Sequence, residues 1–222
     1  TLTIPLFDPA LQSPEYGGGP LRARYVPTVN LPPPSGDPTW TWKSRGLLEF
    51  TPSVARGLVA STTGTARIAV LDARDGRIIW TKRQSTAAPM AASPAIITTE
   101  DTLLAAGMNG RLNAYSLSNG NAKWEFSTGN SKIESSPLVS DGTVYIGAHN
   151  GSLYAVTTNA GTLRWKFQAR ADIKGSVAKS GNTVIFGDYS GTIYAVNATT
   201  GTEIWRQTIG KRLYGGPAIS GN

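Results

Sequence analysis

The chain has 222 residues, a formal net charge of +7 and no cysteine, which excludes disulfides, thiolate metal sites and a cysteine nucleophile. Hydrophobic residues make up 40% and charged residues 16%, as in ordinary globular proteins, and no apolar run approaches the roughly 18 residues of a transmembrane helix. Because the basic residues are scattered along the chain, we expect no nucleic-acid partner, although a basic surface can attract an acidic one.

Residues 1–39 differ from the rest of the chain in composition. They hold nine of the fourteen prolines and show no periodic apolar pattern. Proline lacks the backbone N–H donor and fixes φ, which favours extended backbone on a surface. The sequence therefore predicts a Pro-rich extended arm or linker at 1–39, followed by a folded region at 40–222.

The folded region repeats with a period of about forty residues. Tryptophans mark the copies, 38, 44, 41 and 40 residues apart. A glycine stands four residues before each of the last four tryptophans, and a small apolar residue stands ten residues before. The tryptophans are Trp42, Trp80, Trp124, Trp165 and Trp205, the glycines are Gly76, Gly120, Gly161 and Gly201, and the small residues are Val70, Ala114, Ala155 and Ala195.

Between the tryptophans, alternating apolar and polar residues predict short strands. Residues 143–147 and 152–156 predict two strands, and residues 183–187 and 192–196 predict the same two strands one repeat later. Asn150-Gly151 between the first two is typical of a β-hairpin turn. Each repeat thus predicts about four short antiparallel strands, which is the pattern of one β-propeller blade.

We therefore predict an all-β fold, a β-propeller of four-stranded antiparallel blades. Four complete repeats end at Trp205, and a partial fifth begins at 215–220. Glycine permits a tight turn into the outermost strand, and an indole can cover a neighbouring blade while its N–H meets a carbonyl. We assign these structural roles to Trp80, Trp124, Trp165 and Trp205 and to Gly76, Gly120, Gly161 and Gly201.

The segments at 155–165 and 195–205 resemble the tryptophan-docking motif of the quinoprotein-like repeat family, which is named after pyrroloquinoline quinone (PQQ). Their sequences are Ala-Val-Thr-Thr-Asn-Ala-Gly-Thr-Leu-Arg-Trp and Ala-Val-Asn-Ala-Thr-Thr-Gly-Thr-Glu-Ile-Trp. Ser-Ser-Pro at 135–137 is similar to the start of the family's innermost strand. The resemblance covers about residues 40–222. It implies that the chain is part of a ring of seven or eight blades, with closure into five blades as the alternative.

The resemblance implies two classes of function, because a fold does not fix a function. PQQ-dependent dehydrogenases hold PQQ in the central funnel with a calcium ion, an acidic base and often a disulfide between adjacent cysteines. A lipoprotein assembly factor of the same fold scaffolds outer-membrane protein insertion. Here cysteine is absent and no acidic cluster has calcium-loop spacing. We expect no catalytic, cofactor-binding or metal-binding residue; PQQ and calcium belong only to the dehydrogenase alternative.

His149 is the only histidine, and Asp188 falls in the matching turn of the next repeat. No second histidine and no acidic residue lies beside His149 in the sequence. We therefore expect both side chains to be solvated loop residues without a catalytic or metal-binding role.

Four bases follow the tryptophans in three successive repeats, in the loops that return from the outermost strand to the innermost one. They are Lys132, Lys174, Lys211 and Arg212, and they lie 8, 9, 6 and 7 residues after their tryptophans. Because equivalent propeller loops surround the funnel on one face, these bases are expected to lie close to one structural position and to form an arc. Such an arc attracts an acidic ligand or protein; independent, solvated charges are the alternative.

The sequence therefore predicts a non-catalytic, extracytoplasmic propeller that acts as a binding scaffold. Its partner would be a protein or an acidic small ligand. The compartment would be periplasmic, secreted or a membrane-anchored ectodomain, with membrane association through a part outside this chain left open. The alternative is a fragment of a PQQ-dependent dehydrogenase.

Overall fold

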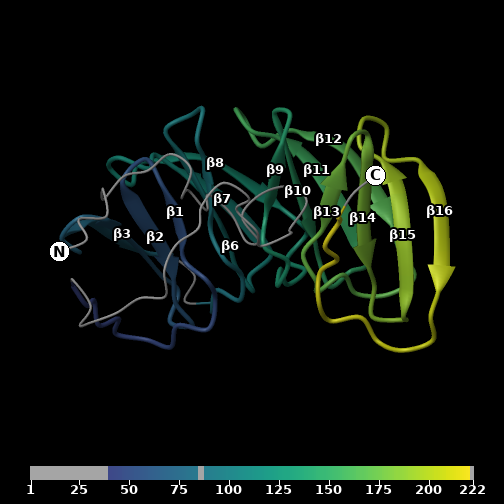
Figure 1. The fold of residues 1–222 in the computed structure, drawn as a ribbon, viewed down its shortest axis with the longest axis horizontal. Helices are drawn as coiled ribbons and strands as arrows, with labels where there is room; N and C mark the ends of the chain where they lie inside the picture. Colours follow the sequence, from purple (N-terminus) through teal and green to yellow (C-terminus); the bar gives the residue numbers. More distant parts are fainter. Residues whose placement is uncertain (1–39, 85–87, 221–222) are drawn as a thin grey trace.

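A computed structural model describes residues 40–84 and 88–220; the predicted arm at 1–39 lies outside the described residues. The described chain is all-β and forms four sheets of four antiparallel strands, which confirms the predicted fold class. Figure 1 shows the four blades following one another from β1 on the left to β16 on the right. No described segment forms a helix long and apolar enough to cross a membrane.

Each blade is a meander in which consecutive strands are neighbours. Blade 1 has β1 (Ser53–Ala55), β2 (Leu58–Thr62), β3 (Arg67–Asp72) and β4 (Ile78–Arg83). Blade 2 has β5 (Ala95–Ile97), β6 (Thr102–Ala106), β7 (Arg111–Tyr115) and β8 (Ala122–Ser127). Blade 3 has β9 (Leu138–Ser140), β10 (Thr143–Gly147), β11 (Ser152–Thr157) and β12 (Leu163–Gln168). Blade 4 has β13 (Ala178–Ser180), β14 (Thr183–Gly187), β15 (Thr192–Asn197) and β16 (Glu203–Thr208).

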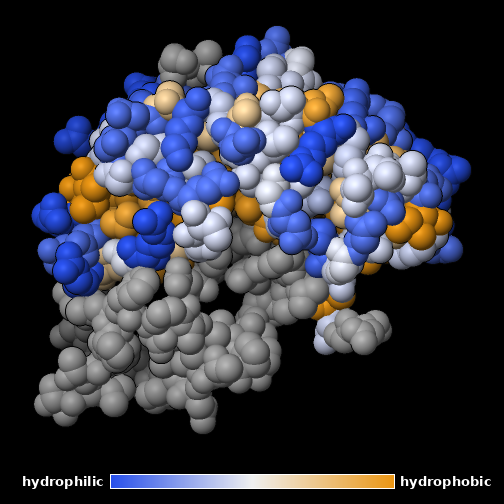
Figure 2. Space-filling view, turned by 90° about the horizontal axis from the view of Figure 1, so that it is seen from above, coloured by the Kyte–Doolittle hydropathy of each residue, from blue (hydrophilic) through white to orange (hydrophobic). Residues whose placement is uncertain are grey.

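The hydrophobic core lies between neighbouring blades, in buried clusters that the facing sheets share. One buried cluster joins blades 3 and 4, and two similar clusters join blades 1 and 2 and blades 2 and 3. Between blades 3 and 4, Phe186 stacks on Tyr194 at a ring-centroid distance of 5.2 Å, and Phe167 packs edge-on against both rings. The outer surface of the arc is mainly hydrophilic, with hydrophobic residues in small separate patches (Figure 2).

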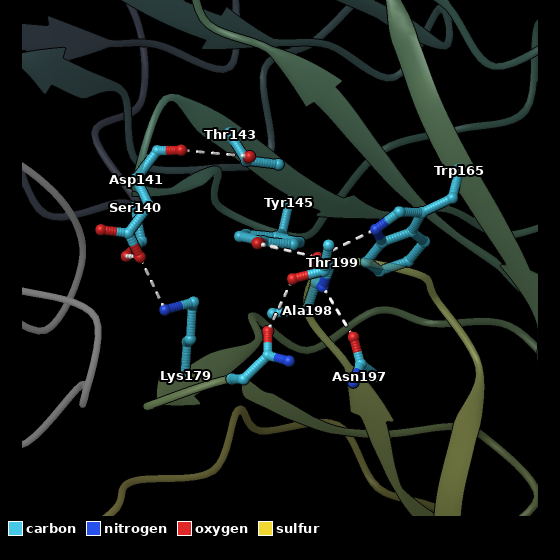
Figure 3. Close-up of polar contacts among 10 residues, drawn as sticks. Ser140, Asp141, Thr143, Tyr145, Trp165, Lys179, Asn197, Ala198 and Thr199 are labelled. Atoms are coloured by element: carbon cyan, nitrogen blue, oxygen red, sulfur yellow. Dashed lines mark hydrogen bonds and ion pairs between the residues drawn. The ribbon is translucent and has the colours of Figure 1, made fainter.

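Each tryptophan of the outermost strands β4, β8 and β12 reaches into the following blade. Trp165 illustrates the contact: its indole N–H donates a hydrogen bond of 2.9 Å to the Ala198 carbonyl oxygen (Figure 3). Gly201 lies under the same ring, since a Cβ there would fall 2.6 Å from indole atoms. Trp80 and Trp124 donate in the same way to Leu117 and Thr158. The glycine four residues before one tryptophan therefore receives the ring of the preceding tryptophan.

A cross-blade ion pair lies beside this contact. The Lys179 ammonium of blade 4 is 2.8 Å from the carboxylate of Asp141, in the turn between β9 and β10 of blade 3 (Figure 3). The hydrogen bond from Lys179 lowers the pKa of the Asp141 carboxyl. The blades are thus joined by polar contacts as well as by their apolar faces.

Trp40, and not Trp42, is the first tryptophan of the structural repeat. Its indole N–H donates to the Ala73 carbonyl oxygen at 3.0 Å, and its ring lies over Gly76. The choice of Trp42 as the first member was therefore wrong by two residues. With Trp40, the first spacing becomes forty residues, in line with the later spacings.

The polar residue eight positions before each of the last four tryptophans stabilises the turn that follows it, because its side chain accepts a hydrogen bond from a backbone N–H of that turn. The acceptors are the side chains of Asp72, Ser116, Thr157 and Asn197. Beyond β16, residues 209–220 form no strand. Residues 215–216 nevertheless lie against Gly175 and Ser176, which come just before the innermost strand β13.

Candidate functional site: the return-loop face

One face of the arc carries the loops that lead from an outermost strand to the next innermost strand. We call the segments 128–137, 169–177 and 209–217 the return loops, and the surface they form the return-loop face. The hairpins between the second and third strands lie on the same face. His149 N–H donates to the Lys132 carbonyl oxygen at 3.0 Å, and Tyr189 N–H donates to the Asp172 carbonyl oxygen at 2.8 Å.

These backbone contacts define which loop positions are equivalent. The matching bonds of His149 and Tyr189 make Lys132 equivalent to Asp172. In the same way, Ile173 N–H donates to Ala148 and Leu213 N–H donates to Asp188, so the residues that follow, Lys174 and Tyr214, are equivalent. Asp172 precedes Ile173 as Arg212 precedes Leu213, so Lys132 and Arg212 share one structural position. Lys211 lies one residue before that position and Lys174 two residues after it.

A cavity of about 550 Å³ opens where the return loops approach the innermost strands. One position from each of five successive repeats lines it, namely Glu49, Ala91, Glu134, Lys174 and Tyr214. Serines from the same loops also contribute. Ser93 N–H donates to Ser136 Oγ, Ser136 N–H donates to Ser176 Oγ, and the buried Ser93 Oγ itself lacks a hydrogen bond. The cavity thus joins carboxylate, ammonium, phenol and hydroxyl groups in one concave surface.

Two of the four predicted bases meet at one aromatic ring. The Lys174 ammonium lies 4.5 Å from the centroid of the Tyr189 ring, and the Arg212 guanidinium lies 5.0 Å from it. Lys174 is also 5.7 Å from the centroid of Tyr214, which packs edge-on against Tyr189. Cation–π contacts of this kind hold a charged head in place without neutralising it. Lys174 and Arg212 therefore present positive charge at fixed positions.

Lys132 and Lys211 take no part in this aromatic cluster within the described part of the chain. Both side chains are exposed. They add charge to the return-loop face but are not held by rings, so the structure brings together two of the four bases and leaves two as exposed loop charges.

His149 is not the solvated residue that its isolation in the sequence suggested. Its side chain is 18% exposed and lies between two carboxylates from separate return loops. Nε2 is 3.0 Å from Glu134 Oε1, although not in hydrogen-bonding geometry, and Nδ1 is 3.6 Å from Asp172 Oδ2. These become ion pairs when the imidazole is protonated. The carboxylates are 15 and 23 residues away in the chain, so no local pattern revealed them.

Tyr214 links the partial fifth repeat to the third. Its hydroxyl donates a hydrogen bond of 3.0 Å to Glu134 Oε2, across 80 residues of sequence. This bond to a carboxylate raises the pKa of the Tyr214 phenol. The sequence analysis missed Tyr189, Tyr214, Glu134 and Asp172. Aligning the loops of successive repeats could have found them. In that alignment Tyr189 is equivalent to His149, and Tyr214 is equivalent to Lys174 and Glu134.

Asp188 is fully buried, so the expectation of a solvated side chain was wrong. Its carboxylate accepts hydrogen bonds from the Ala171, Ser190 and Thr192 backbone N–H groups and from the Tyr194 hydroxyl. Burial opposes the charged form, but these hydrogen bonds outweigh burial and lower the pKa of Asp188. Asp188 is therefore a structural anion that fastens the return loop at 169–177 to blade 4.

The sequence matches known proteins along most of its length. A family model described as outer membrane protein assembly factor BamB matches residues 24–167 and 149–222. A relative of the same description from Yersinia pestis is 29% identical over 142 residues. That alignment covers 59% of this chain and 36% of the Yersinia protein, so the chain spans about a third of the length of this curated relative.

Solved structures share the fold at lower identity. BamB from Moraxella catarrhalis is 17% identical, with a TM-score of 0.62 over 72% of this chain and 48% of that chain. Quinohemoprotein alcohol dehydrogenase from Comamonas testosteroni is also 17% identical, with a TM-score of 0.74 over 92% and 42%. The computationally designed Ika4 protein is 14% identical, with a TM-score of 0.64 over 73% and 99%. These similarities concern the fold alone.

Proposed function

Because the chain belongs to the PQQ-repeat family of the outer membrane protein assembly factor BamB, we propose that it is a non-catalytic scaffold that binds another protein outside the cytoplasm. The proposed binding surface is the return-loop face, and the proposed partner presents an acidic surface to it. The observation that carries the proposal is the set of bases on this face, of which Lys174 and Arg212 are held over the Tyr189 ring.

Electrostatics supports an acidic partner. Lys132, Lys211 and Arg212 are exposed, and the whole chain carries a net charge of +7. Exposed charges contribute little individually, but their summed potential steers an oppositely charged partner and speeds its encounter. This steering weakens with salt, because the Debye length is about 8 Å at physiological ionic strength.

We further propose that the chain works without the quinone cofactor of the quinoprotein dehydrogenases. Within 40–84 and 88–220, no group of three or more His, Asp and Glu side chains is placed to hold a metal ion. Reconstitution of the chain with PQQ and calcium, followed by a dye-linked alcohol dehydrogenase assay, is expected to give no turnover above the cofactor alone. Turnover above that blank would favour the dehydrogenase alternative.

Site-specific photo-cross-linking tests the scaffold directly. A photoreactive amino acid replaces Lys132 or Lys211 on the return-loop face. In a control it replaces Asn159, which is exposed in the turn between β11 and β12 at the opposite ends of the strands. Irradiated intact cells are expected to give discrete protein adducts from Lys132 and Lys211 but not from Asn159. Adducts from Asn159 alone would place the partner on the opposite face and contradict the proposal.

A further inference from the structure

A second concave surface lies on the outer side of the arc between blades 1 and 2, beside the start of the loop that follows β4. It is a groove of about 380 Å³. Its wall is formed by Lys82, Arg83 and Gln84 at the end of β4, by Asn113 and Tyr115 of β7, and by residues 122–125 of β8. None of the four bases of the return-loop face belongs to it.

The Gln84 side chain gives this groove an unsatisfied polar group. The residue is 6% exposed, yet neither its Nε2 nor its Oε1 makes a hydrogen bond within 40–84 and 88–220. Burial raises the pKa of Tyr115 and Gln84 opposes that rise, so the two side chains are close, but they do not meet in hydrogen-bonding geometry. A buried donor or acceptor without a partner costs about 1–3 kcal/mol. Gln84 therefore has both a donor and an acceptor to offer to a ligand.

The other repeats show that this glutamine is not required by the fold. In each repeat, the first residue after the outermost strand donates its backbone N–H to a carbonyl in the hairpin between the second and third strands of the same blade. These residues are Gln84, Thr128, Ala169 and Ile209. Thr128 satisfies its hydroxyl with a bond of 2.6 Å to the Ser131 carbonyl oxygen. Ala169 and Ile209 have no polar side-chain atom. An unsatisfied amide occurs at this position only beside the groove, among the four repeats.

The groove also runs along an open strand edge. β8 is the outermost strand of its sheet and has β7 as its one neighbour there. Successive residues of a strand point to opposite faces, so a groove over one face would meet every second residue. Asn113 and Tyr115 of β7, a strand paired on both edges, line the groove, and the ladder places Glu125 and Ala122 of β8 opposite them across a register shift. The groove therefore covers one face of blade 2, and β8 at its border keeps an unpaired edge where backbone groups can pair with an added strand.

The charge of the groove selects an acidic occupant. Lys82, Arg83 and Lys123 line it, while its one carboxylate, Glu125, already pairs with Arg111 at 2.7 Å. Lys82 is held in place, because its ammonium donates to the Gly120 carbonyl oxygen at 2.7 Å and lies 4.9 Å from the centroid of the Tyr115 ring. The Lys123 ammonium donates to Thr102 Oγ1 at 2.6 Å, outside the groove lining, so Lys82 and Arg83 supply the positive charge that an occupant meets.

We propose that this groove binds an extended, acidic segment of a partner protein. The segment adds along the open edge of β8, and one of its peptide groups pairs with the Gln84 amide, since a peptide group offers the complementary donor and acceptor together. Its acidic side chains face Lys82 and Arg83. This site is independent of the scaffold function proposed for the return-loop face, because the two surfaces share no residue.

A fluorescent Glu-Val-Glu-Val-Glu peptide, acetylated and amidated at its ends, is a suitable probe. Its binding to the full chain is measured by anisotropy. The corresponding Lys-Val-Lys-Val-Lys peptide tests charge, and the acidic peptide with N-methylated valines tests backbone pairing. We expect the acidic peptide to bind at least about tenfold more tightly than either comparison peptide. The proposal would be overturned if the lysine peptide or the methylated peptide bound as tightly as the acidic peptide.

Two variants locate the site. Gln84→Leu removes both polar atoms at similar size. It is expected to weaken the acidic peptide about tenfold while leaving the unfolding midpoint unchanged or raised. Lys82→Glu/Arg83→Glu is expected to abolish binding, whereas Arg164→Glu/Lys166→Glu on β12 is the matched control and retains it. Unchanged binding in Gln84→Leu, or a lowered unfolding midpoint of that variant, would overturn the proposal.

Discussion

Trp165 and Trp205 occupy the same position in successive repeats but lie in different environments. Trp165 is 9% exposed, because the turn of blade 4 receives its ring and the Ala198 carbonyl accepts its N–H. Trp205 is 45% exposed on β16, whose residues are all exposed. The two repeats share the Gly-Thr-X-X-Trp sequence. The comparison shows that the tryptophan stabilises a junction between blades and not its own blade, as expected for nearest-neighbour coupling in repeat proteins.

Truncation of the two tryptophans gives the largest expected difference. Trp165→Ala removes a docked ring and is expected to cost about 3–5 kcal/mol of unfolding free energy. Trp205→Ala removes a half-exposed ring and is expected to cost about 1 kcal/mol or less. Urea unfolding of both variants and the parent measures the difference. Equal losses would contradict a role for the ring at the junction.

The glycine side of the junction can be broken separately. Gly161 has a φ of +64°, and a Cβ there would lie 2.4 Å from the Trp124 ring. Gly181 has a φ of +51°, but a Cβ there would meet no atom within 4 Å. Gly181→Ala should therefore cost only backbone strain, about 1–2 kcal/mol, whereas Gly161→Ala adds overpacking of about 1–3 kcal/mol. Similar unfolding free energies for the two variants would show that Trp124 does not need the glycine.

How much of this arrangement the sequence revealed depends on the range of the contact. Strand positions and the tryptophan–glycine repeat followed from local periodicity, which the sheets confirm. The glycine was assigned to its own turn, whereas the tryptophan ring that it receives lies in the preceding repeat, 36 to 40 residues earlier in the sequence. Contacts between blades depend on how sheets stack, and no local pattern records that.

The return-loop face was predicted less completely for the same reason. The four bases were found, but only Lys132 and Arg212 share one position, and Lys174 matches Tyr214. His149 was judged from its sequence neighbours, whereas its carboxylates come from two other loops. Regular strands keep their repeat positions, while loops that gather around a centre bring together residues that have no fixed spacing.

Asp188 provides a pH-dependent test of the loop anchoring. Its pKa in the folded chain lies below the ordinary value of 3.8, so its contribution to stability is present above that pH and is lost as the pH falls below it. Asp188→Asn places an amide N–H against hydrogen-bond donors and is expected to cost about 1–3 kcal/mol at neutral pH. Urea midpoints measured from about pH 5 down to about pH 2 should fall less steeply in the variant. The same slope in both proteins would contradict the buried, ionised carboxylate.

The smallest expected effect concerns the exposed bases. Lys132→Ala removes a solvated side chain and should change the unfolding free energy by no more than about 0.5 kcal/mol. A urea unfolding curve that overlays the parent curve is the expected outcome. A clear loss of stability would mean that Lys132 is a structural residue, and charge changes on this face would then not report on binding alone.

The most direct test of the scaffold proposal combines cross-linking with charge reversal. The photoreactive residue stays at position 132, and the remaining bases of the face are reversed as Lys174→Glu, Lys211→Glu and Arg212→Glu. The matched control reverses Arg56, Arg77 and Arg164 at the opposite ends of the strands. We expect the adduct at position 132 to fall at least about tenfold after reversal on the return-loop face and with rising salt in a cell extract, and to persist in the control. An adduct that survives both reversal and salt would contradict binding through this basic face.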